Sequence, residues 1–102
     1  MYGTVARYQI KPGTEAQVEN EFRQFQQAKV PGFIGTYVYR MDANPHELYL
    51  AVIFESKEAY QANAGSPEQD ARYRKLLPLL EKEPDWHDGE VMYEASLVVP
   101  QM

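Results

Sequence analysis

Two neighbouring stretches of this chain alternate like β-strands and are apolar on both faces, which constrains the fold more than any other feature. They run from Val30 to Arg40 and from Leu48 to Phe54. Because successive strand side chains point to opposite faces, such strands need a cover on each side. In the first stretch, alternation sends Phe33, Tyr37 and Tyr39 to one face. A chain of 102 residues has helices enough for one face, so we expect a second copy to cover the other.

The segment before these strands is expected to hold one strand and one helix. Residues 2–10 alternate as a strand, which Lys11-Pro12-Gly13 ends. Thr14 and Gln17 have the spacing of a capping box, in which both side chains satisfy free N–H groups at a helix start. The apolar residues that follow recur at helical spacing and form one stripe, namely Val18, Phe22, Phe25 and Ala28.

The segment after the two strands is expected to hold helices and a last strand. Ser56 caps a short helix that stops at Gly65, and Ser66-Pro67 starts the next helix, with proline at its first position. Pro78 has no N–H to donate and should end that helix. We place the final strand at 91–99. The order strand, helix, strand, strand, helix, strand predicts an α+β, ferredoxin-like fold with an antiparallel sheet.

Composition narrows the class of function. The formal charge is −5 and cysteine is absent. An acidic chain without a basic run argues against nucleic acid and anionic membranes as partners. No apolar run is long enough to span a bilayer, and no signal peptide is visible. We therefore expect a cytoplasmic protein of one domain, residues 1–102.

Two segments resemble the antibiotic biosynthesis monooxygenase superfamily. They are Pro31-Gly-Phe33 and the run Phe54-Glu-Ser-Lys-Glu-Ala-Tyr60, followed by Ser66-Pro67 and a short helix. The resemblance covers nearly the whole chain and implies a dimeric α/β-barrel with the βαββαβ order, and hence a homodimer. The family contains cofactor-free monooxygenases acting on aromatic polyketides, haem-degrading enzymes and quinol oxygenases. Fold alone does not choose among these activities.

The haem-degrading branch is tested residue by residue. That branch uses an asparagine in the first strand, a tryptophan in the helix after the third strand and a histidine in the following helix. The corresponding positions here are Ala6, Asn63 and Tyr73, so none of the three matches. A phenolate at Tyr73 can ligate ferric iron in principle, but a tyrosine in an amphipathic helix usually packs in the core. We therefore expect no functional haem site.

The polyketide-anthrone branch matches at two of four positions. Its asparagine and tryptophan correspond to Leu50 and Phe54, which do not match, whereas its tyrosine and arginine correspond to Tyr60 and Arg74. The resemblance implies that Tyr60 and Arg74 are catalytic, with Arg74 balancing a phenolate and Tyr60 orienting it. The competing interpretation makes Tyr60 a core residue and Arg74 a solvated charge. We expect a cavity between the sheet and the helices, lined by Phe54, Tyr60, Asn63, Tyr73 and Arg74.

Other candidates for chemistry carry less weight. His87 lies between two carboxylates in the run Asp85–Asp88, which can bind a metal or act as a base. No further ligands appear at a recognisable spacing, so a loop leading into the last strand is favoured, and we expect no metal. Trp86 is of more interest for assembly, since tryptophan often anchors interfaces.

Two functions remain. The first is a cofactor-independent monooxygenase acting on a small phenolic, quinol or polyketide-type aromatic substrate. The second is a non-catalytic dimeric barrel that binds a small aromatic ligand. The first needs no metal or flavin, because an electron-rich substrate, once deprotonated, reduces oxygen itself. Oxygen uptake with hydroquinones and anthrones separates the two.

Overall fold

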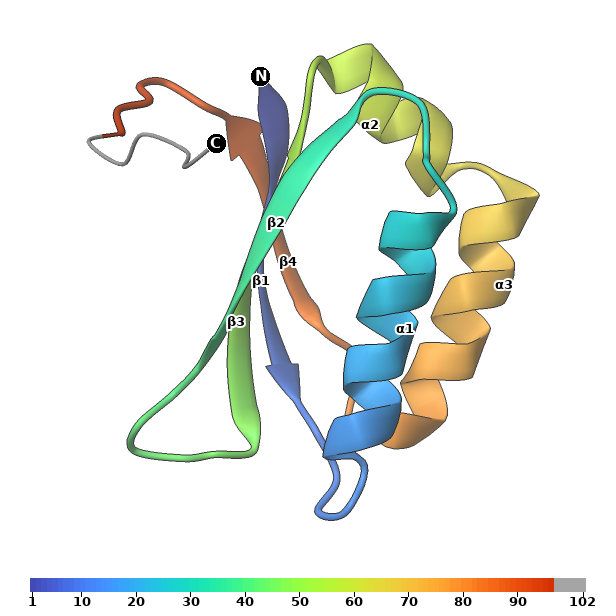
Figure 1. Cartoon of the computed structure of the whole chain (residues 1–102), viewed down its shortest axis with the longest axis vertical. Helices are drawn as coiled ribbons and strands as arrows, with labels where there is room; N and C mark the ends of the chain where they lie inside the picture. Colours follow the sequence, from blue (N-terminus) through green and yellow to red (C-terminus); the bar gives the residue numbers. More distant parts are fainter. Residues whose placement is uncertain (97–102) are drawn as a thin grey trace, which may run out of the picture.

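Four strands form one antiparallel sheet in the order β2-β3-β1-β4 in the computed structural model, which describes residues 1–96 (Figure 1). The strands are β1 (Tyr2–Gln9), β2 (Phe33–Arg40), β3 (Glu47–Phe54) and β4 (Asp85–Glu90). All the helices lie on one side of the sheet, with α1 and α3 side by side (Figure 1). They are α1 (Glu15–Gln27), α2 (Lys57–Ala64) and α3 (Pro67–Leu76), with a short 3-10 turn at Leu77–Leu79. The expected α+β, ferredoxin-like fold with an antiparallel sheet is confirmed.

The core lies between the helices and the face of the sheet turned towards them, called here the inner face. Alternate residues of β1 and β3 point to this face and are almost fully buried, while α1 and α3 contribute Val18 and Leu76 from above. The buried strand residues are Ala6, Tyr8, Leu48, Leu50 and Phe54. Burying this apolar surface supplies most of the driving force for folding.

The opposite face of the sheet, called here the outer face, is left uncovered by residues 1–96. Tyr37 is 70% exposed, Tyr39 59% and Val5 52%. The expectation that Phe33 shares this face is wrong. A β-bulge between Phe33 and Gly35 inserts an extra residue, so Phe33 lies opposite Phe54 on the inner face while Tyr37 lies opposite Ala51 on the outer face.

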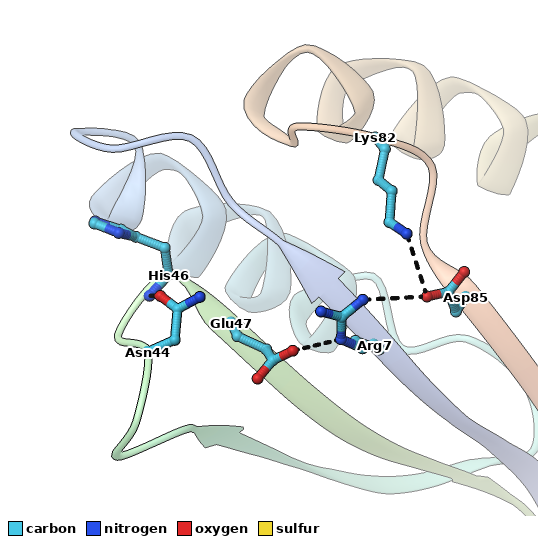
Figure 2. Close-up of polar contacts among 6 residues, drawn as sticks. All are labelled: Arg7, Asn44, His46, Glu47, Lys82 and Asp85. Atoms are coloured by element: carbon cyan, nitrogen blue, oxygen red, sulfur yellow. Dashed lines mark hydrogen bonds and ion pairs between the residues drawn. The ribbon is translucent and has the colours of Figure 1, made fainter.

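One end of the outer face is charged rather than apolar. Arg7 on β1 forms an ion pair with Glu47 on β3 and another with Asp85 on β4, at 3.5 Å (Figure 2). Lys82 lies 3.8 Å from the same Asp85 carboxylate. In the turn between β2 and β3 the side-chain oxygen of Asn44 accepts from the backbone N–H of His46. The outer face therefore has an apolar part and a charged end whose ion pairs are already made within one chain.

The helix boundaries follow the sequence signals with one exception. The hydroxyl oxygens of Ser56 and Ser66 accept from backbone N–H groups at the starts of α2 and α3, at 3.0 and 3.1 Å, and α3 ends just before Pro78 as expected. The prediction of a capping box at Thr14 is wrong. The Thr14 hydroxyl instead donates to the carbonyl oxygens of Lys11 and Leu79, which ties the β1–α1 turn to the 3-10 turn after α3.

The last strand lies earlier in the chain than expected. It spans Asp85–Glu90, and residues 91–96 form no strand, while residues 97–99 of the expected strand lie outside the described part. The apolar residues from Val91 onwards led to the prediction of a strand in the wrong segment. The segment 85–90 is mostly polar because β4 is an edge strand whose backbone pairs with β1. Within residues 1–96 no helix has the length and apolar character needed to cross a membrane.

Candidate functional site

A cavity of about 420 Å³ lies between the inner face of the sheet and the helices. Its volume falls in the range of small-molecule sites. A wider groove of about 930 Å³ runs between α1 and β2, but the aromatic rings and polar groups discussed below converge on the smaller cavity. Every strand and every α-helix contributes to its lining.

Aromatic rings form most of the cavity wall. The ring centroids of Phe33 and Phe54 are 5.6 Å apart, and those of Phe54 and Tyr60 are also 5.6 Å apart. On the other side the Trp86 ring lies 5.9 Å from Tyr8 and 6.2 Å from Tyr73. These distances are typical of favourable edge-to-face and tilted contacts. The wall therefore offers flat apolar surfaces to an aromatic guest.

One end of the cavity gathers Tyr60, Asp88 and Thr4. The hydroxyl of Tyr60 on α2 donates to a carboxylate oxygen of Asp88 on β4 at 2.8 Å. Asp88 lies opposite Thr4 in the β1–β4 pairing, so both side chains face the cavity. Thr4 is only 5% exposed, and its hydroxyl oxygen has no hydrogen-bond partner among the described residues. Thr4 therefore borders this end of the cavity, but its hydroxyl oxygen is itself buried beneath the surface.

The ionisation of Tyr60 is strongly disfavoured at this end. Burial raises the pKa of Tyr60 to about 12, and the hydrogen bond to Asp88 adds to the shift, while the Thr4 hydroxyl beside Tyr60 lowers it. Tyr60 therefore stays neutral at physiological pH. It can donate a hydrogen bond but does not serve as a base.

Arg72 of α3 borders the cavity beside Phe25 of α1, and this part is called here the Arg72 end. Its guanidinium lies 5.2 Å from the Phe25 ring centroid. One N–H group donates to the side-chain oxygen of Asn63 at 3.3 Å and another to that of Gln69 at 3.1 Å. No described carboxylate lies within 4.0 Å of it. Since both amide partners are neutral, neither of them neutralises the charge of Arg72.

Arg74 lies elsewhere. Its side chain is 77% exposed, pairs with Asp70 one helical turn earlier at 3.0 Å, and is absent from the lining of the cavity. Residues two apart on a helix point to nearly opposite sides, so α3 turns Arg72 inward and Arg74 outward. The expectation that Arg74 lines the cavity is therefore corrected to Arg72.

A model of the antibiotic biosynthesis monooxygenase family matches residues 1–75. The chain belongs to this family. Solved structures with the same fold include SnoaB, a cofactor-independent oxygenase from Streptomyces nogalater, in a mutant form; the identity is 16%, the TM-score 0.78, and the match covers 91% of this chain and 94% of that one. A conserved protein from Methanosarcina mazei has 21% identity and a TM-score of 0.74, with 86% and 89% covered. At these identities the likeness shows the fold alone. No match was found among curated proteins.

Within this family member, four of the five expected lining residues do border the cavity. They are Phe54, Tyr60, Asn63 and Tyr73, and their roles in binding or catalysis stay predictions. Sequence reasoning missed Thr4, Trp86 and Asp88. Thr4 shares the alternating face of Tyr8 in β1, a signal that was present. The other two were hidden because the segment 85–88 was expected to be a loop.

The candidate metal and haem residues named from the sequence form no site in the described part of the chain. His87 lies opposite Val5 on the outer face, away from the cavity. Ala6, at the position of the haem-branch asparagine, is fully buried in the core. Within residues 1–96 no three histidine, aspartate or glutamate side chains are grouped so as to hold a metal ion.

Proposed function

We propose that this protein is a cofactor-independent monooxygenase that binds a small phenolic, quinol or polyketide-type aromatic molecule in the cavity. The observation that carries the proposal is Arg72, an arginine without a carboxylate partner in a cavity walled by aromatic rings. Membership of the monooxygenase family supports it.

The chemistry requires little from the protein beyond binding and electrostatics. An ionised hydroxyaromatic is rich in electrons and can reduce oxygen directly. Oxidation of a ring methylene to a ketone by one O₂ balances, since one oxygen atom enters the product and the other leaves as water. The chain must hold the anion, stabilise its charge and exclude bulk water.

Three features of the described residues support these proposed tasks. Arg72 takes the role of charge balance that the sequence assigned to Arg74, because a guanidinium stays charged and donates in a fixed fork. Tyr60 keeps its proposed role of orienting the substrate by a hydrogen bond, which its oxygen accepts because its single O–H donates to Asp88. Phe54, Tyr73 and Asn63 form binding surface around the ring system.

Oxygen uptake with a panel of anthrones and hydroquinones, beginning with dithranol, tests the proposal. The matched variants are Arg72→Gln and Arg74→Gln, two residues apart on the same helix. Losing a charge-assisted contact inside the cavity should lower kcat/KM about 10- to 100-fold, whereas loss of the exposed Arg74 charge should change it less than about twofold. Equal effects of the two variants would contradict the role given to Arg72.

A non-catalytic binding function is the second candidate. The observation that favours it is the loss of the anthrone branch's asparagine and tryptophan, which are replaced here by Leu50 and Phe54. In that case hydroxyaromatic compounds would bind in the cavity, and no oxygen would be consumed above the rate in buffer.

We also propose a homodimer joined through the outer faces of two sheets. The support is the exposed apolar part of that face, formed by Val5, Tyr37, Tyr39 and Tyr49. Contiguous apolar surface of this kind is uncommon on soluble monomers and often marks an interface.

A further inference from the structure

We propose that the cavity selects aromatic molecules that carry an anionic group at one end and a protonated hydroxyl group at the other. The inference rests on the proposed function and deepens it by naming the substrate class. It comes from the unequal charges at the two ends of the cavity, Arg72 at one and Asp88 at the other.

The Arg72 end is built to receive an anion. Arg7, Arg23 and Arg74 each lie within ion-pair distance of a carboxylate. Arg72, like Arg40 outside the cavity, has no carboxylate partner among residues 1–96, and it donates to the amide oxygens of Asn63 and Gln69. These two bonds orient the guanidinium and use two of its five N–H groups, which leaves donors for a carboxylate or an enolate.

Two acidic residues also border the cavity and must be weighed against this charge. Asp70 is already paired with Arg74 at 3.0 Å, and Glu21 lies on α1 without an ion pair to Arg72. Neither approaches the guanidinium within 4.0 Å. The positive charge of Arg72 is therefore not cancelled by direct contact.

The Asp88 end is built to receive a hydroxyl donor. An ionised carboxylate only accepts hydrogen bonds, and Asp88 accepts one from Tyr60 while its charge repels a second anion. The accepting capacity of the Asp88 carboxylate is not used up by the bond from Tyr60. A ligand hydroxyl can therefore donate to Asp88.

The space between the ends fits a flat ring system. Phe25, Phe33, Phe54, Tyr73 and Trp86 contribute rings to the lining of a cavity of about 420 Å³. The ligand class is therefore a fused hydroxyaromatic acid, or a related compound with one ionised and one protonated oxygen.

Titration calorimetry with three probes tests this selection. The probes are a hydroxynaphthoic acid with its two groups at opposite ends, naphthoic acid and naphthol. The first should bind at least about tenfold more tightly than either of the others, since each end contributes a charge-assisted hydrogen bond. Similar affinities for all three probes would overturn the proposal.

Variants at each end should act on different probes. Arg72→Gln should weaken both acids about tenfold or more and leave naphthol within about twofold. Asp88→Asn should weaken the two hydroxylated probes and leave naphthoic acid unchanged or bound more tightly, because a repelling charge is removed. A variant that weakens all three probes alike would contradict the two-ended site.

Matched controls separate these effects from misfolding and from the proposed activity. Arg74→Gln on α3 and Glu90→Gln on β4 remove charges that lie outside the cavity lining, so they should leave all three affinities unchanged. Circular dichroism should report a native fold for every variant used. Oxygen consumption without selective binding would defeat this inference alone, whereas selective binding without oxygen consumption would defeat the proposed catalysis alone.

Discussion

The two faces of the sheet are built from the same strands and differ in almost everything else. On the inner face Ala6, Tyr8 and Phe54 are at most 4% exposed. On the outer face Tyr37 is 70% and Val5 52% exposed. Alternation with a period of two sorts side chains between faces, but burial depends on what packs above each face. The helices cover one face and enclose the cavity, while the other face leaves apolar side chains exposed.

The largest expected effect concerns the inner face. Replacing Leu50 by alanine removes a side chain that is 3% exposed in the middle of β3, and the resulting cavity should cost about 2–5 kcal/mol of unfolding free energy. Urea denaturation at fixed protein concentration measures it. Ile34→Ala is the control, because Ile34 is 53% exposed and should cost less than half as much. A loss below about 1 kcal/mol for Leu50→Ala would show that this face is loosely packed.

The next expected effect tests how closely the backbones of β1 and β3 approach each other at Gly3. A Cβ atom built on Gly3 lies 1.7 Å from the carbonyl oxygen of Val52, whereas one on Gly89, directly opposite on β4, meets nothing within 4 Å. Gly3→Ala should therefore cost about 1–3 kcal/mol or more, because backbone must move. Gly89→Ala should be neutral or slightly stabilising. Similar midpoints of thermal unfolding for the two variants would contradict the close approach at Gly3.

The sequence was a good guide to the inner face and a poorer one to the site. Periodicity located the first three strands and all three helices, because each has a repeating apolar pattern and a clear boundary residue. It failed at β4, since an edge strand can be polar wherever its backbone pairs with a neighbour. It also failed at the bulge beside Ile34, which changes the face of Phe33 without changing the composition.

The residues of the site could not all be predicted from sequence spacing, because they depend on helix rotation and strand register. Arg72 and Arg74 are equivalent in a helical pattern until the rotation of α3 about its axis is known. That rotation is set by packing, with Leu76 in the core and Tyr73 against Trp86. Asp88 entered the site only because β4 pairs with β1 in a register that places it opposite Thr4.

A third expected effect concerns the outer face itself. Light scattering should give a mass of twice 11.8 kDa at micromolar concentration. Tyr37→Asp places a charge within the apolar part of that face and should cost about 1–2 kcal/mol of dimerisation free energy or more, which shifts the protein towards monomer. Gln61→Asp on the exposed surface of α2 is the control for added charge and should leave the mass unchanged. A wild-type protein that is monomeric under these conditions would defeat the proposed interface.

The smallest expected effect is a pH dependence that arises at the inner face. The pKa of Tyr60 is raised to about 12, chiefly by burial, while an unfolded tyrosine titrates near pH 10. Between these values the folded state binds more protons than the unfolded state, so unfolding free energy should fall as pH rises from about 10 to about 12. Below pH 10 this contribution is fully present. The pKa of Tyr8 is also raised by burial, so it adds a slope of the same sign.

Tyr60→Phe isolates the contribution of Tyr60. The variant loses the hydrogen bond to Asp88 at every pH, which lowers its stability by a nearly constant amount, but its stability should fall less steeply with pH above 10 than that of the wild type. Urea midpoints collected across this range measure the two slopes. Equal slopes for Tyr60→Phe and the wild type would mean that Tyr60 ionises as readily in the folded protein as in the unfolded chain. It would then no longer be held as a neutral donor at the Asp88 end, and the difference between a protected inner face and an open outer face would not extend to the cavity.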